Sequence, residues 1–138
     1  MSWATVDGAS RATAAAGAHG SATAPQGERG ETLSWVRQEV TALVDEQAPD
    51  AVVVCPAEGG SGNALTERSQ VDGVVIEELH ARNMPTRIKK SATIRSNFGA
   101  RSANAFATAV AAVPAVEGIP RTAARREPTI AALSELPA

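Results

Sequence analysis

The 138-residue sequence predicts an α/β fold, in which helices flank a mixed sheet. Strand and helix patterns alternate along the middle of the chain, and an apolar run there, set between two prolines, is typical of a buried strand. A short strand followed by a turn opens the chain, so an antiparallel hairpin joins strands that are otherwise parallel. The length fits one domain, which we expect to span residues 1–138.

The first elements follow from turn chemistry and hydrophobic spacing. "SWATV" predicts a strand that ends before Asp7, "DGAS" predicts a turn, and residues 11–18 fit a second strand. Residues 14–30 are rich in Ala, Gly, Ser and Thr, and they also fit a loose connection. Apolar residues at helical spacing then predict a helix over 33–47, with Thr32 as its N-cap.

The remaining elements alternate strand and helix. "AVVVC" predicts a strand buried on both faces and central in its sheet, and "PAEGGSGN" predicts a loop. Residues 64–82 fit a second helix, "MPTRI" a strand and residues 100–113 an Ala-rich helix. We expect residues 114–138 to be irregular apart from a short helix in "EPTIAALSEL", with Pro128 in its first turn.

Composition limits the core and the function classes. Aromatic residues make up 3% of the chain, so the core is thin and we expect a homodimer interface to stabilise it. The single cysteine, Cys55, excludes an internal disulfide. We find neither a signal-peptide pattern nor an apolar segment of the roughly 18 residues that a membrane span needs, and we expect a cytoplasmic protein with no membrane partner.

Charge is unevenly distributed, although the net charge is only −2. Residues 1–78 hold four Lys/Arg and twelve Asp/Glu, whereas residues 79–126 hold nine Lys/Arg and one Asp/Glu. The segment 82–101 carries six basic residues and no acid. Lys89, Lys90, Arg95 and Arg101 are therefore candidate contacts to nucleic-acid phosphates. The alternative is a solvated surface, or one that pairs with the protein's own acidic half across a dimer.

Three acids are candidate catalytic residues. Asp7 stands at the end of a strand, where open α/β sheets bind ligands, but Asp is also a common turn residue. Together with Glu58, it could hold Mg²⁺ or Mn²⁺, hard ions that activate water for phosphodiester hydrolysis. Glu127 is a third candidate. Cys55 fits a small buried core residue better than a nucleophile, and the loop Gly59–Asn63 fits either a plain connection or a phosphate cradle in a nucleotide-binding domain.

Several short strings resemble the RuvC-type Holliday junction resolvases of the RNase H-like superfamily. "VDGASRATAAAG" is similar to the family's first strand, turn and return strand. "EQAPDAVVVCPAEGGSGNALTERSQVDGVVIEELHARNMPT" and "RIKKSATIRSNFGARSANAFATAV" are similar to its middle and to its Lys-Lys segment with the following helix. The likeness covers roughly residues 3–113. It implies an RNase H-like fold and a metal-dependent nuclease that acts on branched DNA.

The sequence departs from the family at its catalytic acids. Cys55 stands where the family closes its central strand with Glu, and Glu127 has no second acid until Glu135, whereas the family opens its last helix with an acid pair. Asp7 alone carries over directly. The resemblance therefore leaves two hypotheses: a RuvC-like nuclease of branched DNA, or a catalytically degenerate RNase H-like domain that binds nucleic acid or protein without cleavage.

Overall fold

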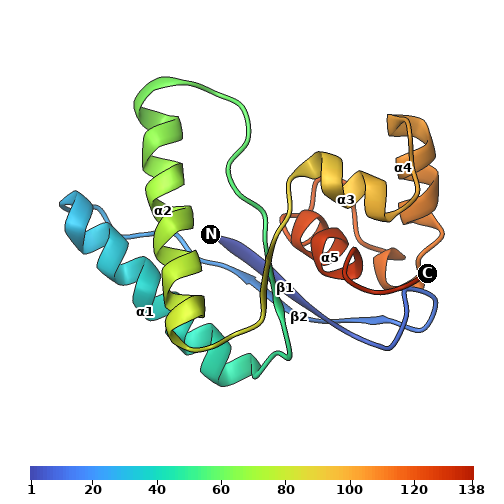
Figure 1. Cartoon of the computed structure of the whole chain (residues 1–138), viewed down its shortest axis with the longest axis horizontal. Helices are drawn as coiled ribbons and strands as arrows, with labels where there is room; N and C mark the ends of the chain where they lie inside the picture. Colours follow the sequence, from blue (N-terminus) through green and yellow to red (C-terminus); the bar gives the residue numbers. More distant parts are fainter. The chain divides into compact units, whose positions relative to one another are not determined.

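The computed structural model describes the whole chain, Met1–Ala138, which contains both helices and strands (Figure 1). The strands are β1 (Ser2–Asp7), β2 (Ala15–Ser21), β3 (Val52–Val54) and β4 (Thr86–Ile88). The helices are α1 (Arg29–Gln47), α2 (Gly62–Ala81), α3 (Ser91–Asn97), α4 (Ala103–Ala111), α5 (Arg126–Leu133) and a 3-10 turn at Pro114–Val116. None of these helices is long and apolar enough to cross a membrane.

The chain forms two compact units. Unit 1 contains Met1–Ala22 and Lys89–Ala138, and unit 2 contains Thr23–Ile88. Each unit has its own two-stranded sheet and its own cluster of buried side chains. The expectation of one domain over residues 1–138 stays a prediction.

Unit 1 begins with the hairpin that the sequence predicts. β1 and β2 pair antiparallel, from Ser2 opposite Ser21 to Asp7 opposite Ala15, with a register shift in between. Most of the segment 14–30 is therefore regular, and only residues 22–28 lie between β2 and α1. The turn needs glycine at its start, since Gly8 has a φ of 153° and a Cβ there would lie 2.6 Å from the Ala14 Cα.

The core of unit 1 is built from small aliphatic side chains, as the composition predicts. Val110, Val113, Val116 and Leu133 are buried together with Ala14 and Ala115. Phe98 and Phe106 pack against this cluster, and the centroids of their rings lie 5.6 Å apart in an edge-to-face arrangement. Helix α5 contacts β1 along this core. The short helix that we expected within residues 114–138 corresponds to α5.

Unit 2 is a strand–helix–strand unit. β3 and β4 pair in parallel, with Val52 opposite Thr86 and Val54 opposite Ile88, and α2 forms the crossover between them. The predicted parallel pairing is therefore correct. The predicted central position of the apolar strand is wrong, because β3 belongs to a two-stranded sheet and has β4 as its hydrogen-bonded neighbour.

Helices α1 and α2 lie side by side in unit 2 (Figure 1). Val36 and Val40 of α1 are buried with Val54 and Leu79, so one apolar stripe of each helix faces this core. The predicted start of α1 is wrong: Thr32 lies inside the helix, and its N-cap is Glu28. The Glu28 backbone N–H donates to the Glu31 carboxylate at 3.1 Å, which satisfies a donor at this terminus.

Helix α3 is the one helix that the sequence does not predict. Its seven residues hold one buried apolar side chain, Ile94, so hydrophobic periodicity gives no signal. The Ala-rich helix is shorter than the range 100–113 and begins at the Ser102 cap, whose hydroxyl accepts from the Ala105 backbone N–H at 3.1 Å.

Candidate nucleic-acid interface and candidate acids

Asp7 is the last residue of β1 and is exposed. It faces Ala15 in the strand ladder, and the turn that follows is held by other residues: the Thr13 N–H donates to the Ser10 carbonyl at 3.2 Å, and their hydroxyls are 3.0 Å apart. The structure thus places the Asp7 carboxylate at an open strand end.

Glu127 lies in the first turn of α5, away from the end of the helix that contacts the β1–β2 turn. The Arg11 N–H in that turn donates to the Pro137 carbonyl, just beyond the C-terminal end of α5, at 2.8 Å. An eight-residue helix is about 12 Å long. Helix α5 also contacts β1, the strand that ends at Asp7.

Glu58 belongs to unit 2, in the loop between β3 and α2. Gly59, Gly60 and Gly62 have positive φ angles here, as a tight loop requires. The Asp72 carboxylate accepts from the Ala57 N–H at 2.8 Å, and Arg68 donates to the Gly59 carbonyl at 3.3 Å. The loop of the nucleotide-binding hypothesis is thus braced by α2 itself.

The acids that could hold a metal ion are divided between the two units. No group of three or more His, Cys, Asp or Glu side chains lies together. Cys55, which we expected to be buried, is exposed after β3, and a carboxylate does not stand at that strand end. Mg²⁺ and Mn²⁺ prefer several oxygen ligands, and the candidate ligands are Asp7 and Glu127 in unit 1 and Glu58 in unit 2.

Lys89 departs from the phosphate-binding role that the sequence suggests. It is 9% exposed, and its ammonium donates to the Asn97 side-chain oxygen at 2.8 Å and to the carbonyl and hydroxyl of Ser134 at 3.1 Å each. It also pairs with Glu135 at 2.7 Å. With its donors satisfied inside unit 1, Lys89 fixes the start of α3 to the end of α5.

The other three candidate cations remain exposed in and around α3. Lys90 is the N-cap residue of α3, Arg95 lies in its last turn, and Arg101 lies between α3 and α4. Sequence reasoning missed a fourth cation, Arg11, which donates to the Asn97 carbonyl at 2.8 Å and lies 4.6 Å over the Phe98 ring. These partners are 86 and 87 positions away in the chain, so no local pattern could reveal them.

This fold is similar to that of known protein structures. Comparison with protein-family profiles gives no match, and neither does comparison with curated sequences. The structure of Thermus thermophilus RuvC matches with a TM-score of 0.72 at 17% identity, over 95% of this chain and 82% of that one. T. thermophilus RuvC in complex with a Holliday junction substrate matches with a TM-score of 0.69 at 17% identity, over 97% and 91%.

The fold is RuvC-like. The expectation of an α/β, RNase H-like architecture is confirmed. At 17% identity the likeness establishes the fold and does not establish the function.

Proposed function

We propose that this protein acts on branched DNA and that binding is the step its residues support best. Lys90, Arg95 and Arg101 are exposed in unit 1 within a segment without acids, as phosphate contacts require. The RuvC structure that matches 97% of this chain is described as bound to a Holliday junction, which supports a branched rather than a linear substrate.

The charge balance of unit 1 carries this proposal. Unit 1 holds eight Lys/Arg and four Asp/Glu, whereas unit 2 holds five Lys/Arg and eleven Asp/Glu. One of the four acids of unit 1, Glu135, already pairs with the buried Lys89. The net charge of unit 1 is therefore positive, and a positively charged unit attracts a polyanion over about 8–10 Å even when the net charge of the whole chain is negative.

Cleavage is the second candidate function, and one observation favours it. Asp7 is the last residue of β1, and its exposed carboxylate is accessible to a metal ion or a substrate from solvent. Mg²⁺ or Mn²⁺, held by Asp7 and Glu58 with Glu127 as a third acid, would supply the chemistry of hydrolysis. Asp7 and Glu127 belong to unit 1, and Glu58 belongs to unit 2.

Binding is tested by the fluorescence anisotropy of a labelled four-way junction in EDTA, over a series of salt concentrations, with a linear duplex of equal length as the comparison. Each of Lys90→Gln, Arg95→Gln and Arg101→Gln should lower the slope of log K against log salt by about 1, since each lost phosphate contact releases about one counterion fewer. Arg37→Gln in unit 2, also exposed, is the matched control and should leave the slope unchanged. Equal slopes for all four variants would remove this segment from the interface.

Cleavage is tested on the same labelled junction in Mg²⁺ and in Mn²⁺. Metal-dependent products that disappear in Asp7→Asn would establish a nuclease. Junction binding without products would establish a binding module. Light scattering of the purified protein tests the predicted homodimer, since a single-chain mass of 14.1 kDa at micromolar concentration would refute it.

A further inference from the structure

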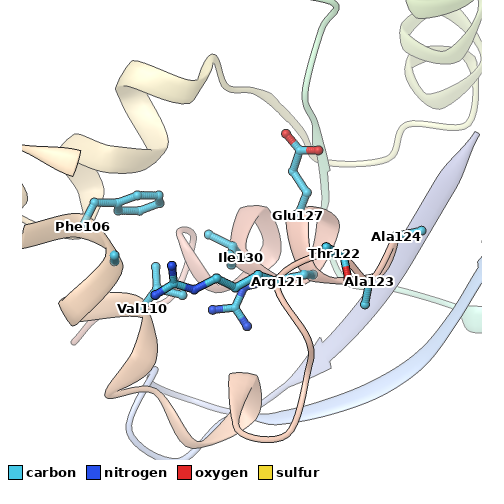
Figure 2. A pocket seen from close by; sticks show the side chains of 10 residues that line it. Phe106, Val110, Arg121, Thr122, Ala123, Ala124, Glu127 and Ile130 are labelled. Atoms are coloured by element: carbon cyan, nitrogen blue, oxygen red, sulfur yellow. The ribbon is translucent and has the colours of Figure 1, made fainter. Parts of the chain in front are cut away.

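Unit 1 contains an open pocket that the proposed DNA contacts do not use. Its volume is about 510 Å³, and it lies between α4, the segment 121–124 and the first turns of α5 (Figure 2). Lys90, Arg95 and Arg101 do not line it, and of the three candidate acids only Glu127 does. The pocket is therefore separate from the surface to which we assign phosphate contacts.

The floor of this pocket is apolar. Phe106 and Val110 of α4 and Ile130 of α5 lie around the hollow in Figure 2. Val110 is buried, and Phe106 and Ile130 are half-buried while packing against the core of unit 1. The floor is thus held by the fold and suits an aliphatic or aromatic side chain.

The rim of the pocket is mainly basic. Arg121 is exposed, and Arg126 is half-buried with one guanidinium N–H donating to the Ile119 carbonyl at 2.6 Å. Glu127 is the only acid in the lining, and Figure 2 shows its carboxylate extending away from the Arg121 side chain. The segment 121–126 holds three arginines and no acid. A ligand seated on the apolar floor would therefore meet positive charge at the edge.

We propose that this pocket binds an acidic peptide segment of a partner protein by taking up one large apolar side chain of that segment. The charge complementarity of the arginine rim selects carboxylates, and the aliphatic floor selects the apolar anchor. A nucleobase fits less well, because the floor offers no side-chain amide to read its polar edge. Arg121 forms the electrostatic half of the site, and Phe106, Val110 and Ile130 form the apolar half.

The test uses a fluorescein-labelled peptide Asp-Glu-Asp-Leu-Phe and anisotropy with the full chain. Two control peptides separate the two halves of the site: Asp-Glu-Asp-Gly-Gly lacks the apolar anchor, and Lys-Lys-Lys-Leu-Phe reverses the charge. We expect saturable binding of the first peptide alone. Equal binding of both acidic peptides would reduce the effect to general attraction by a basic surface and would overturn the proposal, as would no binding of any peptide.

Matched charge reversals assign the binding to this pocket. Arg121→Glu should weaken peptide binding about tenfold, since an attraction at the rim becomes a repulsion, and it should weaken junction binding less than Arg101→Glu does. Arg101→Glu makes the same charge change in unit 1 outside the pocket, and it should leave peptide binding unchanged. An equal loss of peptide binding in both variants, or displacement of the peptide by unlabelled oligo(dT), would refute a peptide site. Far-UV circular dichroism confirms that both variants are folded.

Discussion

Replacing Lys89 by Met should destabilise the protein strongly, although a lysine in a basic segment looks dispensable from the sequence. The methionine keeps most of the apolar stem but removes the ammonium. Asn97 loses its hydrogen-bond donor at 2.8 Å, the Ser134 carbonyl loses its donor at 3.1 Å, and the Glu135 carboxylate loses its cation at 2.7 Å. Each of these acceptors then depends on the small amount of water that reaches it.

The size of this effect follows from burial. A hydrogen bond to a charged group contributes about 1.5–3 kcal/mol, and removing one partner of a buried ion pair costs about 3–5 kcal/mol. The Glu135 side chain is 29% exposed, so water recovers part of the loss. We expect a decrease of about 2–3 kcal/mol in the free energy of unfolding, which corresponds to a decrease of about 8–12 °C in Tm for a chain of this length.

Urea unfolding followed by far-UV circular dichroism measures this change, and Lys90→Met is the matched control. Lys90 is the next residue and is exposed, so its replacement should change the free energy of unfolding by no more than about 0.5 kcal/mol. The double variant Lys89→Met with Glu135→Leu should recover part of the lost stability, because it leaves no uncompensated carboxylate. If Lys89→Met and Lys90→Met unfold at the same urea concentration, the interior network does not stabilise unit 1.

Two glycine replacements test the backbone of each unit by the same unfolding assay. Gly8→Ala should lower the free energy of unfolding by about 1–3 kcal/mol, because its Cβ would lie 2.6 Å from the Ala14 backbone at a φ of 153°. A wild-type midpoint for this variant would contradict the close approach in the hairpin turn. Gly73→Ala should raise the free energy of unfolding by about 0.5–1 kcal/mol, because Gly73 lies in the interior of α2 and nothing lies within 4 Å of the added Cβ. A lower midpoint would mean that another group occupies this space.

The elements that the sequence predicts well are those whose own residues form a clear hydrophobic pattern. Helices α1 and α2 have apolar residues at helical spacing, and β3 is a valine run between prolines. The hairpin was predicted from a strand and a turn. Helix α3 was missed because one buried side chain makes no period, and the exact cap of α1 was missed because Thr32 looked like a better cap than Glu28.

The candidate site was harder to predict because its decisive contacts are not local. The sequence places Lys89 beside Lys90, and nothing in that pair shows that one ammonium points into a network 45 positions away while the other faces water. Likewise, three arginines in segment 121–126 read as surface charge until α4 supplies an apolar floor beside them. Tertiary packing, rather than residue type, decides which cations are available to a ligand.

This availability changes how the charge of the protein should be interpreted. The segment 82–101 holds six basic residues, but Lys89 pairs with Glu135, and Arg82 belongs to unit 2, where it pairs with Asp45 and Glu78. A count of basic residues therefore overstates the number of phosphate contacts in this segment. Of the four that remain, Arg87 belongs to unit 2, and the three exposed cations of unit 1 imply a salt slope near 3, far below the 6–10 contacts that make DNA binding strongly salt-dependent. Affinity for a junction would then depend on the shape of the DNA as much as on charge.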